Sequence, residues 1–246
     1  MKIRALALAG LLALPAVASA QEPLPPGQLP PARFSVTPFI GLRVPYTTGN
    51  AYLFVGENRS FIIDEDRGGA PLAGVEGEAR LRGPVSLLGS VAFGNGGDHT
   101  IRLTSSEGDD QIPLIADTPD MWMGKLAVAY RLPEPRPDNR RFHPAGFISA
   151  GPALVRTSWA DSDLDGDGIN HWGLNLGVHA ATTLGSPRLA LNIGLEDFLT
   201  FWNTERLAEH DATLYGQYFE DAAMVDFDYT SSNLVVLRAG LSFRFQ

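Results

Sequence analysis

The chain has 246 residues, no cysteine, and 28 acidic against 19 basic residues, which gives a formal net charge of −9. This acidic balance argues against a nucleic-acid-binding surface, and the lack of cysteine excludes stabilisation by disulfides. Apolar residues make up 44% of the chain, but no segment after the N-terminal region has the roughly 18 consecutive apolar residues of a membrane-spanning helix. If this is a membrane protein, its spans must be the strands of a closed barrel.

The N-terminus predicts a secretory signal peptide over residues 1–20. Lys2 and Arg4 precede an apolar run over 5–14, and Ala18-Ser19-Ala20 follows as a cleavage site. The run is too short to cross a membrane as a helix. Cleavage before Gln21 would take the net charge from −9 to −11. We expect a Pro-rich segment over 21–32 and a single barrel domain over 33–246.

Eight segments of the remaining chain alternate between apolar and polar or small side chains. Such a period of two predicts strands with one apolar and one polar face. In the first segment Phe39 interrupts the polar face, and the segment at 145–156 is the weakest because small apolar residues occupy both of its faces. The eight segments are residues 34–46, 73–82, 85–93, 122–132, 145–156, 172–184, 189–196 and 233–246.

The links between these segments alternate between long and short, and all the long ones fall at one end of an antiparallel barrel. This asymmetry is typical of outer-membrane barrels with short periplasmic turns and long extracellular loops. We predict an all-β fold, a closed antiparallel transmembrane β-barrel of eight strands, or of ten if a hairpin over 51–63 joins the wall. Residues 99–104 could extend the preceding strand, and residues 204–214 could form a short helix. A soluble sandwich or lipocalin-like barrel has the same periodicity with its apolar face inside.

The last segment carries a further signal. Arg238, Gly240, Phe243 and Phe245 follow the pattern polar, any, Gly, any, any, aromatic, any, aromatic. This pattern resembles the C-terminal signal that outer-membrane barrels present to their assembly machinery, although that family usually ends on the aromatic residue and this chain ends on Gln246. With the strand pattern, it makes the chain similar to the small OmpA/OmpX-type barrels of Gram-negative bacteria. The resemblance implies a monomer in the outer membrane, in contact with lipid and lipopolysaccharide.

The inward face of the predicted barrel is charged. Since the first strand neighbours both the second and the last, we expect Arg43, Glu76, Glu78 and Arg238 to meet inside. An eight-stranded barrel is only wide enough for side chains to fill it, so these charges predict a salt-bridge network that plugs the lumen. A narrow polar path for small solutes is the alternative. The predicted charge network comprises Arg43, Glu76, Glu78, Arg80, Arg82 and Arg238, and the inward set also includes Lys125, Arg131, Arg156, Glu196 and Arg244.

One long link holds alternating aspartates, Asp161, Asp163, Asp165 and Asp167, separated by small residues. Alternate carboxylates can converge on calcium, but the glutamate that completes an EF-hand loop is missing. We therefore read this link as an acidic turn with at most weak calcium binding, and we expect no other cofactor.

The five histidines show no metal-binding spacing, and His179 has no serine or acid at a matching spacing nearby. The expected function is therefore structural, or an interaction at the cell surface, and not catalysis. A conduit for small solutes or hydrophobic molecules is the alternative, and a lipid-modifying enzyme comes third. The aromatic residues Tyr46, Phe93, Trp122, Tyr130, Trp172, Phe243 and Phe245 are expected in the interfacial girdles and lipid-facing wall of the barrel.

Overall fold

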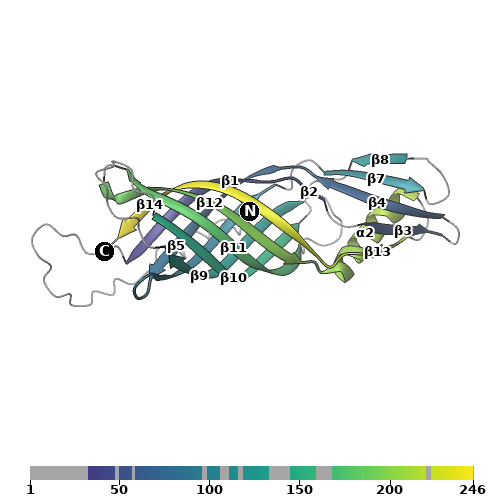
Figure 1. The fold of residues 1–246 in the computed structure, drawn as a ribbon. Helices are drawn as coiled ribbons and strands as arrows, with labels where there is room; N and C mark the ends of the chain where they lie inside the picture. Colours follow the sequence, from purple (N-terminus) through teal and green to yellow (C-terminus); the bar gives the residue numbers. More distant parts are fainter. Residues whose placement is uncertain are drawn as a thin grey trace, which may run out of the picture. The chain divides into compact units, whose positions relative to one another are not determined.

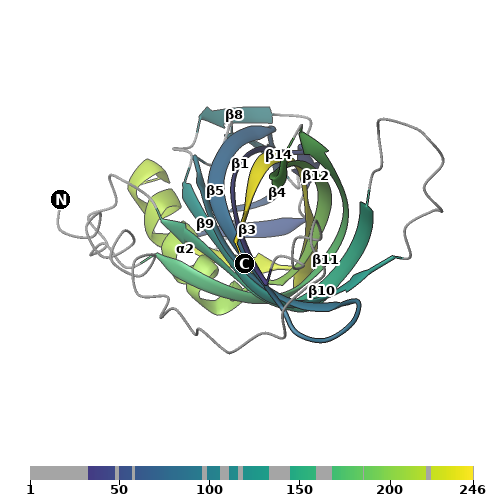
Figure 2. The ribbon, with the colours of Figure 1, turned by 90° about the vertical axis from the view of Figure 1, so that its left-hand side faces the viewer.

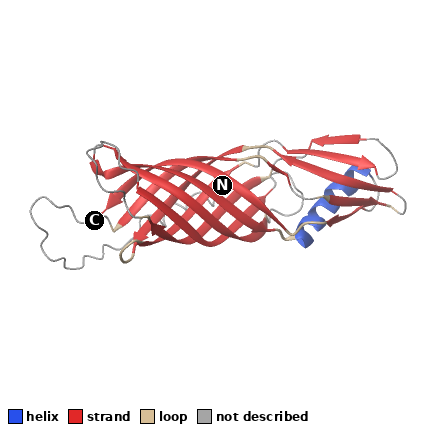
Figure 3. Cartoon of the chain, in the orientation of Figure 1, coloured by secondary structure: helices blue, strands red, loops and turns tan. Residues whose placement is uncertain are grey.

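A computed structural model of the chain describes residues 33–47, 50–56, 59–95, 99–105, 111–115, 119–132, 145–158, 168–184, 186–219 and 223–245. The predicted signal peptide and Pro-rich segment lie outside these residues. The described part consists of a closed barrel and a second sheet that carries one helix (Figures 1 and 3). No helix in the described part is long and apolar enough to cross a membrane.

The barrel confirms the predicted eight antiparallel strands. Their order around the ring is β1-β14-β12-β11-β10-β9-β6-β5, and β5 pairs again with β1 to close it (Figure 2). The first and last strands pair from Phe34 with Phe245 to Arg43 with Val236. The eight strands are β1 (Phe34–Arg43), β5 (Ala70–Arg80), β6 (Val85–Gly94), β9 (Asp120–Arg131), β10 (Ala145–Ser158), β11 (Ile169–Leu184), β12 (Ser186–Phe201) and β14 (Ser231–Phe245).

The alternation within each strand sorts the side chains as a membrane barrel requires. On β11 every second residue from Trp172 to Ala180 is exposed, and the residues between them are buried. The outward apolar residues of β11 include Leu174, Leu176 and Val178, whereas the buried inward residues of other wall strands include charged ones such as Glu76 and Lys125. Apolar side chains outside and charged side chains inside fit a barrel wall that faces lipid and exclude the soluble alternative.

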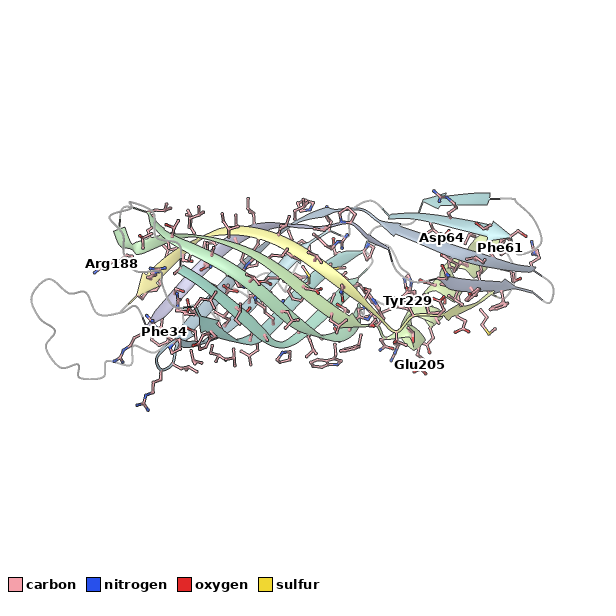
Figure 4. All side chains as sticks on the ribbon, in the orientation of Figure 1. Phe34, Phe61, Asp64, Arg188, Glu205 and Tyr229 are labelled. Atoms are coloured by element: carbon pink, nitrogen blue, oxygen red, sulfur yellow. The ribbon has the colours of Figure 1, made fainter. Side chains whose placement is uncertain are left out.

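Aromatic residues border the apolar wall at both ends. Phe93 and Trp122 pair at one end with ring centroids 4.8 Å apart, and Trp172 pairs with Phe201 at the same end. The exposed Phe34 (Figure 4) pairs with Phe245 at the other end of the wall. Tyr130 and Phe243 are also exposed at that end. Trp122 and Tyr130 are eight residues apart on one tilted strand, which corresponds to a band about 20 Å high. The side chain of Tyr46 lies outside the described residues.

The second sheet is built from the long links and does not enter the barrel wall. Its order is β13-β3-β4-β7-β8, with β2 paired to β4. The hairpin over 51–63 therefore does not add two strands to the barrel, and residues 99–104 do not extend β6, because they pair with β4 instead. The elements are β2 (Tyr46–Thr47), β3 (Ala51–Val55), β4 (Arg59–Arg67), β7 (His99–Ser105), β8 (Gln111–Ile115), β13 (Ala223–Phe227) and α2 (Thr204–Phe219).

Helix α2 covers one face of this sheet. It begins at the predicted residue, where the side chain of Asn203 accepts a hydrogen bond from the Arg206 amide at 3.3 Å and so caps the first turn. Tyr215 of the helix is fully buried against sheet residues such as Leu53 and Ile63. The ring of Phe219 stacks on Phe61, with centroids 5.4 Å apart. The second sheet thus has a hydrophobic core of its own, separate from the interior of the barrel.

Candidate functional site

Four charged side chains from four strands meet in the middle of the barrel. Lys125 Nζ lies 2.6 Å from Glu196 Oε1 and 3.2 Å from Glu76 Oε2. On the other side, Arg238 contacts Glu76 Oε1 at 2.7 Å through its terminal nitrogen and Glu196 Oε1 at 3.0 Å through Nε. We call these four residues the central charge layer. It has two positive and two negative charges, all at least 97% buried, so each charge has an opposite partner, as a buried charge requires.

His179 on β11 completes this layer. Arg238 donates to His179 Nδ1 at 3.2 Å, and because a guanidinium has no acceptor, the ring proton of a neutral His179 must lie on Nε2. On that side lie Ser149 Oγ at 3.4 Å and Glu196 Oε1 at 3.6 Å. Ser149 and Glu196 are thus near His179 in space, although neither lies at a matching spacing in the sequence. The arrangement is nevertheless not that of a catalytic triad, since serine and acid approach the same nitrogen.

Two inward glycines make room for the histidine. A Cβ on Gly194 would lie 2.5 Å from His179 Nδ1, and a Cβ on Gly177 would lie 2.6 Å from His179 Nε2. The other face of the imidazole stacks on Phe147, with centroids 4.4 Å apart and planes 8° apart. The imidazole of His179 is therefore held between the Phe147 ring and the backbone of Gly177 and Gly194. A movement of His179 would displace the charged side chains beside it.

Phe39, which interrupts the polar face of the first strand, also belongs to the layer. The guanidinium carbon of Arg238 lies 4.7 Å from the centre of the Phe39 ring, within the range of a cation–π contact. A Cβ on Gly74 would lie 2.6 Å from this ring. The ring thus covers the one arginine of the layer and shields its ion pairs from the rest of the bore.

The other predicted lumen charges lie elsewhere. Glu78 pairs with Arg131, and Ser35 donates to Glu78 at 3.2 Å. Arg43 is buried but donates to the Gly68 carbonyl at 3.0 Å and contacts Met121 Sδ at 3.5 Å. Register explains the difference, because Thr37 lies opposite Glu76 and Arg43 is six residues further along β1, about 20 Å away. Arg80 and Arg82 are exposed beside the turn over 81–84 and are not part of the layer.

Apolar clusters fill the bore on both sides of the central charge layer. Toward the short turns lie Leu88, Ala127, Ala129 and Phe147. Toward the long links lies a larger cluster that includes Phe39, Met121, Met123, Phe198 and Val236. Trp202 and Leu207, from the link that carries α2, are buried in this second cluster, and Phe227 and Tyr229 pack against it (Figure 4). The long link therefore contributes large side chains to the mouth of the barrel.

The outer face of the second sheet is a further candidate site. Tyr52, Phe54, Ile62 and Met224 point away from α2, and between 36 and 61% of each is exposed. They are neighbours across strands, since Phe54 pairs with Met224 and Tyr52 pairs with Ile62. We call these four residues the apolar sheet face. The exposed Asp64 (Figure 4) lies opposite Arg102 on the same face.

The remaining predicted site residues are placed as follows. The four aspartates of the predicted calcium loop lie outside the described residues, and no group of three or more potential metal ligands occurs within the described ranges. In the assembly motif, Phe243 and Phe245 are exposed on the outer wall, whereas Arg238 points inward. A Cβ on Gly240 would lie 2.8 Å from the side chain of Phe39. The roles suggested for these residues stay predictions.

Comparison with solved structures gives a match to the outer membrane protein OprG from Pseudomonas aeruginosa, with a TM-score of 0.55 and 13% identity over 87% of this chain and 96% of OprG. Neisserial surface protein A (TM-score 0.44, 12% identity, 87% and 98% covered) and Ail of Yersinia pestis (0.35, 11%, 85% and 98%) are more distant. No protein-family model matches the chain, and no curated protein is significantly similar to it in sequence. The likeness to OprG concerns the fold.

Proposed function

Because the chain has the fold of the small eight-stranded outer-membrane β-barrels, we propose that its barrel is a closed anchor and that its second sheet binds a protein partner at the cell surface. The long links carry this sheet, and in outer-membrane barrels the long links are extracellular. The proposal includes no catalysis and no metal.

The contents of the bore support a plugged lumen. The central charge layer is neutral and buried, and apolar clusters lie on both sides of it. An ion that crossed this interior would have to separate paired charges and enter apolar packing, and both steps are costly.

The apolar sheet face carries the proposed interaction. Exposed contiguous apolar patches on an otherwise polar surface mark sites of protein contact. This face belongs to the sheet outside the barrel wall, so lipid does not explain its exposure. The net charge of the long links in the sequence indicates the kind of partner. The links at 44–69, 95–119, 159–168 and 202–230 hold 20 acidic and 4 basic residues, a net charge of −16. A partner with apolar side chains among lysines or arginines fits both features.

Single-channel recording from the refolded protein in a planar bilayer tests the plugged lumen. We expect silence from protein whose folding is confirmed by a heat-dependent gel shift. Steady channel openings whose conductance changes in Glu76→Gln would disprove the closed anchor and favour the alternative, a narrow channel.

Binding of a synthetic amphipathic Lys/Leu peptide to the protein in vesicles tests the sheet face. The triple variant Tyr52→Ser, Phe54→Ser, Met224→Ser keeps the charge and should weaken binding by at least about tenfold, since three apolar side chains lose their contact. The matched variant Asp64→Asn, Asp226→Asn keeps the apolar face and should mainly reduce the salt dependence. Equal affinity of native protein and the serine variant would disprove the role of this face.

A further inference from the structure

One acidic side chain lies on the lipid-facing wall of the barrel. On β12, Leu195, Asp197 and Leu199 point outward, whereas Glu196 between them points into the bore. The cross-strand neighbours of Asp197 are Leu176 on β11 and Val235 on β14. The carboxyl group therefore lies among apolar side chains, and it is separate from the central charge layer.

The position of Asp197 places this group well inside the apolar band. It precedes Phe201, in the aromatic border, by four residues, which corresponds to a depth of about 10 Å along the tilted strand. Ionisable residues at such depth are costly and mark functional sites in membrane proteins. Asp197 Oδ1 is shielded from solvent and has no hydrogen-bond partner among the described residues. The nearby Asn175 side chain donates to the backbone carbonyl of Asp197 at 3.4 Å and not to its carboxyl group.

A groove lies beside this carboxyl group. It has a volume of about 560 Å³ and reaches across four strands from Val128 and Tyr130 on β9 to Asp197 on β12. Its outward residues on β10 are Ile148 and Ala150. Ala150 is smaller than its neighbours Val128 and Leu176 in the same cross-strand row, so the wall is hollowed there. The hydroxyl of Ser149, which also lines the groove, lies near His179 in the bore, whereas Asp197 contributes a carboxyl group from the outer side of the wall.

These observations define an occupant. Apolar walls within the bilayer fit a hydrocarbon chain, and a carboxyl group that lies among apolar side chains at this groove is stabilised by a hydrogen-bond donor. A hydroxyl can enter the bilayer more easily than an ammonium group, whose charge is costly at this depth. We propose that the groove binds a lipid hydrocarbon chain that carries a hydroxyl group along its length, and that this hydroxyl donates to the carboxyl group of Asp197.

The test uses the full protein in detergent micelles, with ¹³C-labelled alanine methyl groups and aspartate carboxyl carbons. The probes are 12-hydroxyoctadecanoic acid and octadecanoic acid, which differ only in the mid-chain hydroxyl. We expect the hydroxylated probe to shift the Ala150 methyl and Asp197 carboxyl signals saturably, at about tenfold lower concentration than the plain probe. That ratio is the effect of one hydrogen bond of about 1.4 kcal/mol.

Two variants distinguish binding of the hydrocarbon chain from recognition of its hydroxyl group. Asp197→Leu should bind both probes equally, as judged by the Ala150 signal, and it should fold well because the new side chain is apolar. Ala150→Phe should fill the groove and abolish the response of Asp197 to both probes, with the gel shift confirming the barrel. Equal affinity of the native protein for the two probes, or shifts that do not saturate, would overturn the proposal. So would an Ala150 signal that follows protein concentration and ignores both probes, which would assign the groove to a second copy of the chain.

Discussion

Replacement of Lys125 by methionine should unbalance the interior of the barrel. Lys125 is in contact with both carboxylates of the central charge layer, and its removal leaves Glu76 and Glu196 to share Arg238. Loss of one partner of a buried ion pair costs about 3–5 kcal/mol, because the remaining charge stays buried. With a urea m-value of roughly 2–3 kcal/mol per M, the unfolding midpoint should fall by about 1–2.5 M.

The double variant Lys125→Met, Glu196→Gln tests whether charge balance is the cause. It leaves Glu76 and Arg238 as a neutral pair, so it should be more stable than Lys125→Met alone, with a coupling free energy of about 1–3 kcal/mol. Urea unfolding in phospholipid vesicles, followed by tryptophan fluorescence and checked for reversibility, measures both quantities. Arg82→Met, at an exposed position, is the control and should change stability by less than about 0.5 kcal/mol. If the losses of the two single variants simply add in the double variant, the reasoning is refuted.

Three further substitutions test other parts of the structure. Gly194→Ala should lower the free energy of unfolding by about 1–3 kcal/mol in the same urea assay, because its Cβ would lie 2.5 Å from His179 Nδ1. The control Gly89→Ala should be nearly neutral, because no atom would lie closer than 4.0 Å to its Cβ. Equal losses of stability in the two variants would contradict this packing. Trp202→Ala should cost about 3–5 kcal/mol by emptying the barrel mouth, but single-channel recordings should stay silent because the central charge layer remains. Leu53→Ala should destabilise the second sheet by about 2–5 kcal/mol, seen as faster amide hydrogen exchange in β3 and β4, and an altered heat-dependent gel shift would show that the barrel depends on this sheet.

The barrel could be predicted because its signal is local. Each wall strand alternates on its own, so the eight segments follow from neighbouring residues alone. In the weakly patterned β10 this does not hold for the faces: the prediction that Arg156 points inward is wrong, because Arg156 lies outward opposite Trp122 and Asn170. The second sheet could not be predicted in the same way. Its strands are mostly short and come from separate links, and only long-range pairing, such as that of β3 with β13, makes them one sheet.

The composition of the central charge layer can be predicted only in part, because alternation is a local signal and contacts between strands are not. Glu76, Lys125, Glu196 and Arg238 were correctly assigned to the inward face by alternation. His179 was missed as their neighbour because the contact depends on register: Phe147 and Gly194 both lie opposite it on adjacent strands. A signal was nevertheless present in Phe39, because an aromatic residue on a polar inward face suggests a cation to cover.

Three of the four ion pairs of the central charge layer connect strands that are not neighbours in the wall. Lys125 on β9 reaches Glu196 on β12, and Glu76 on β5 meets Arg238 on β14, 162 residues later in the chain. Until β14 docks, the central charge layer lacks one of its two cations, and a slip of β14 by a single residue would turn Arg238 toward lipid. Docking of β14 thus neutralises the central charge layer in the same step that closes the wall, so that only the correct register pairs all four of its charges. The ion pairs of Arg238 in the interior therefore favour the correctly closed barrel, in addition to the hydrogen bonds that join β1 to β14.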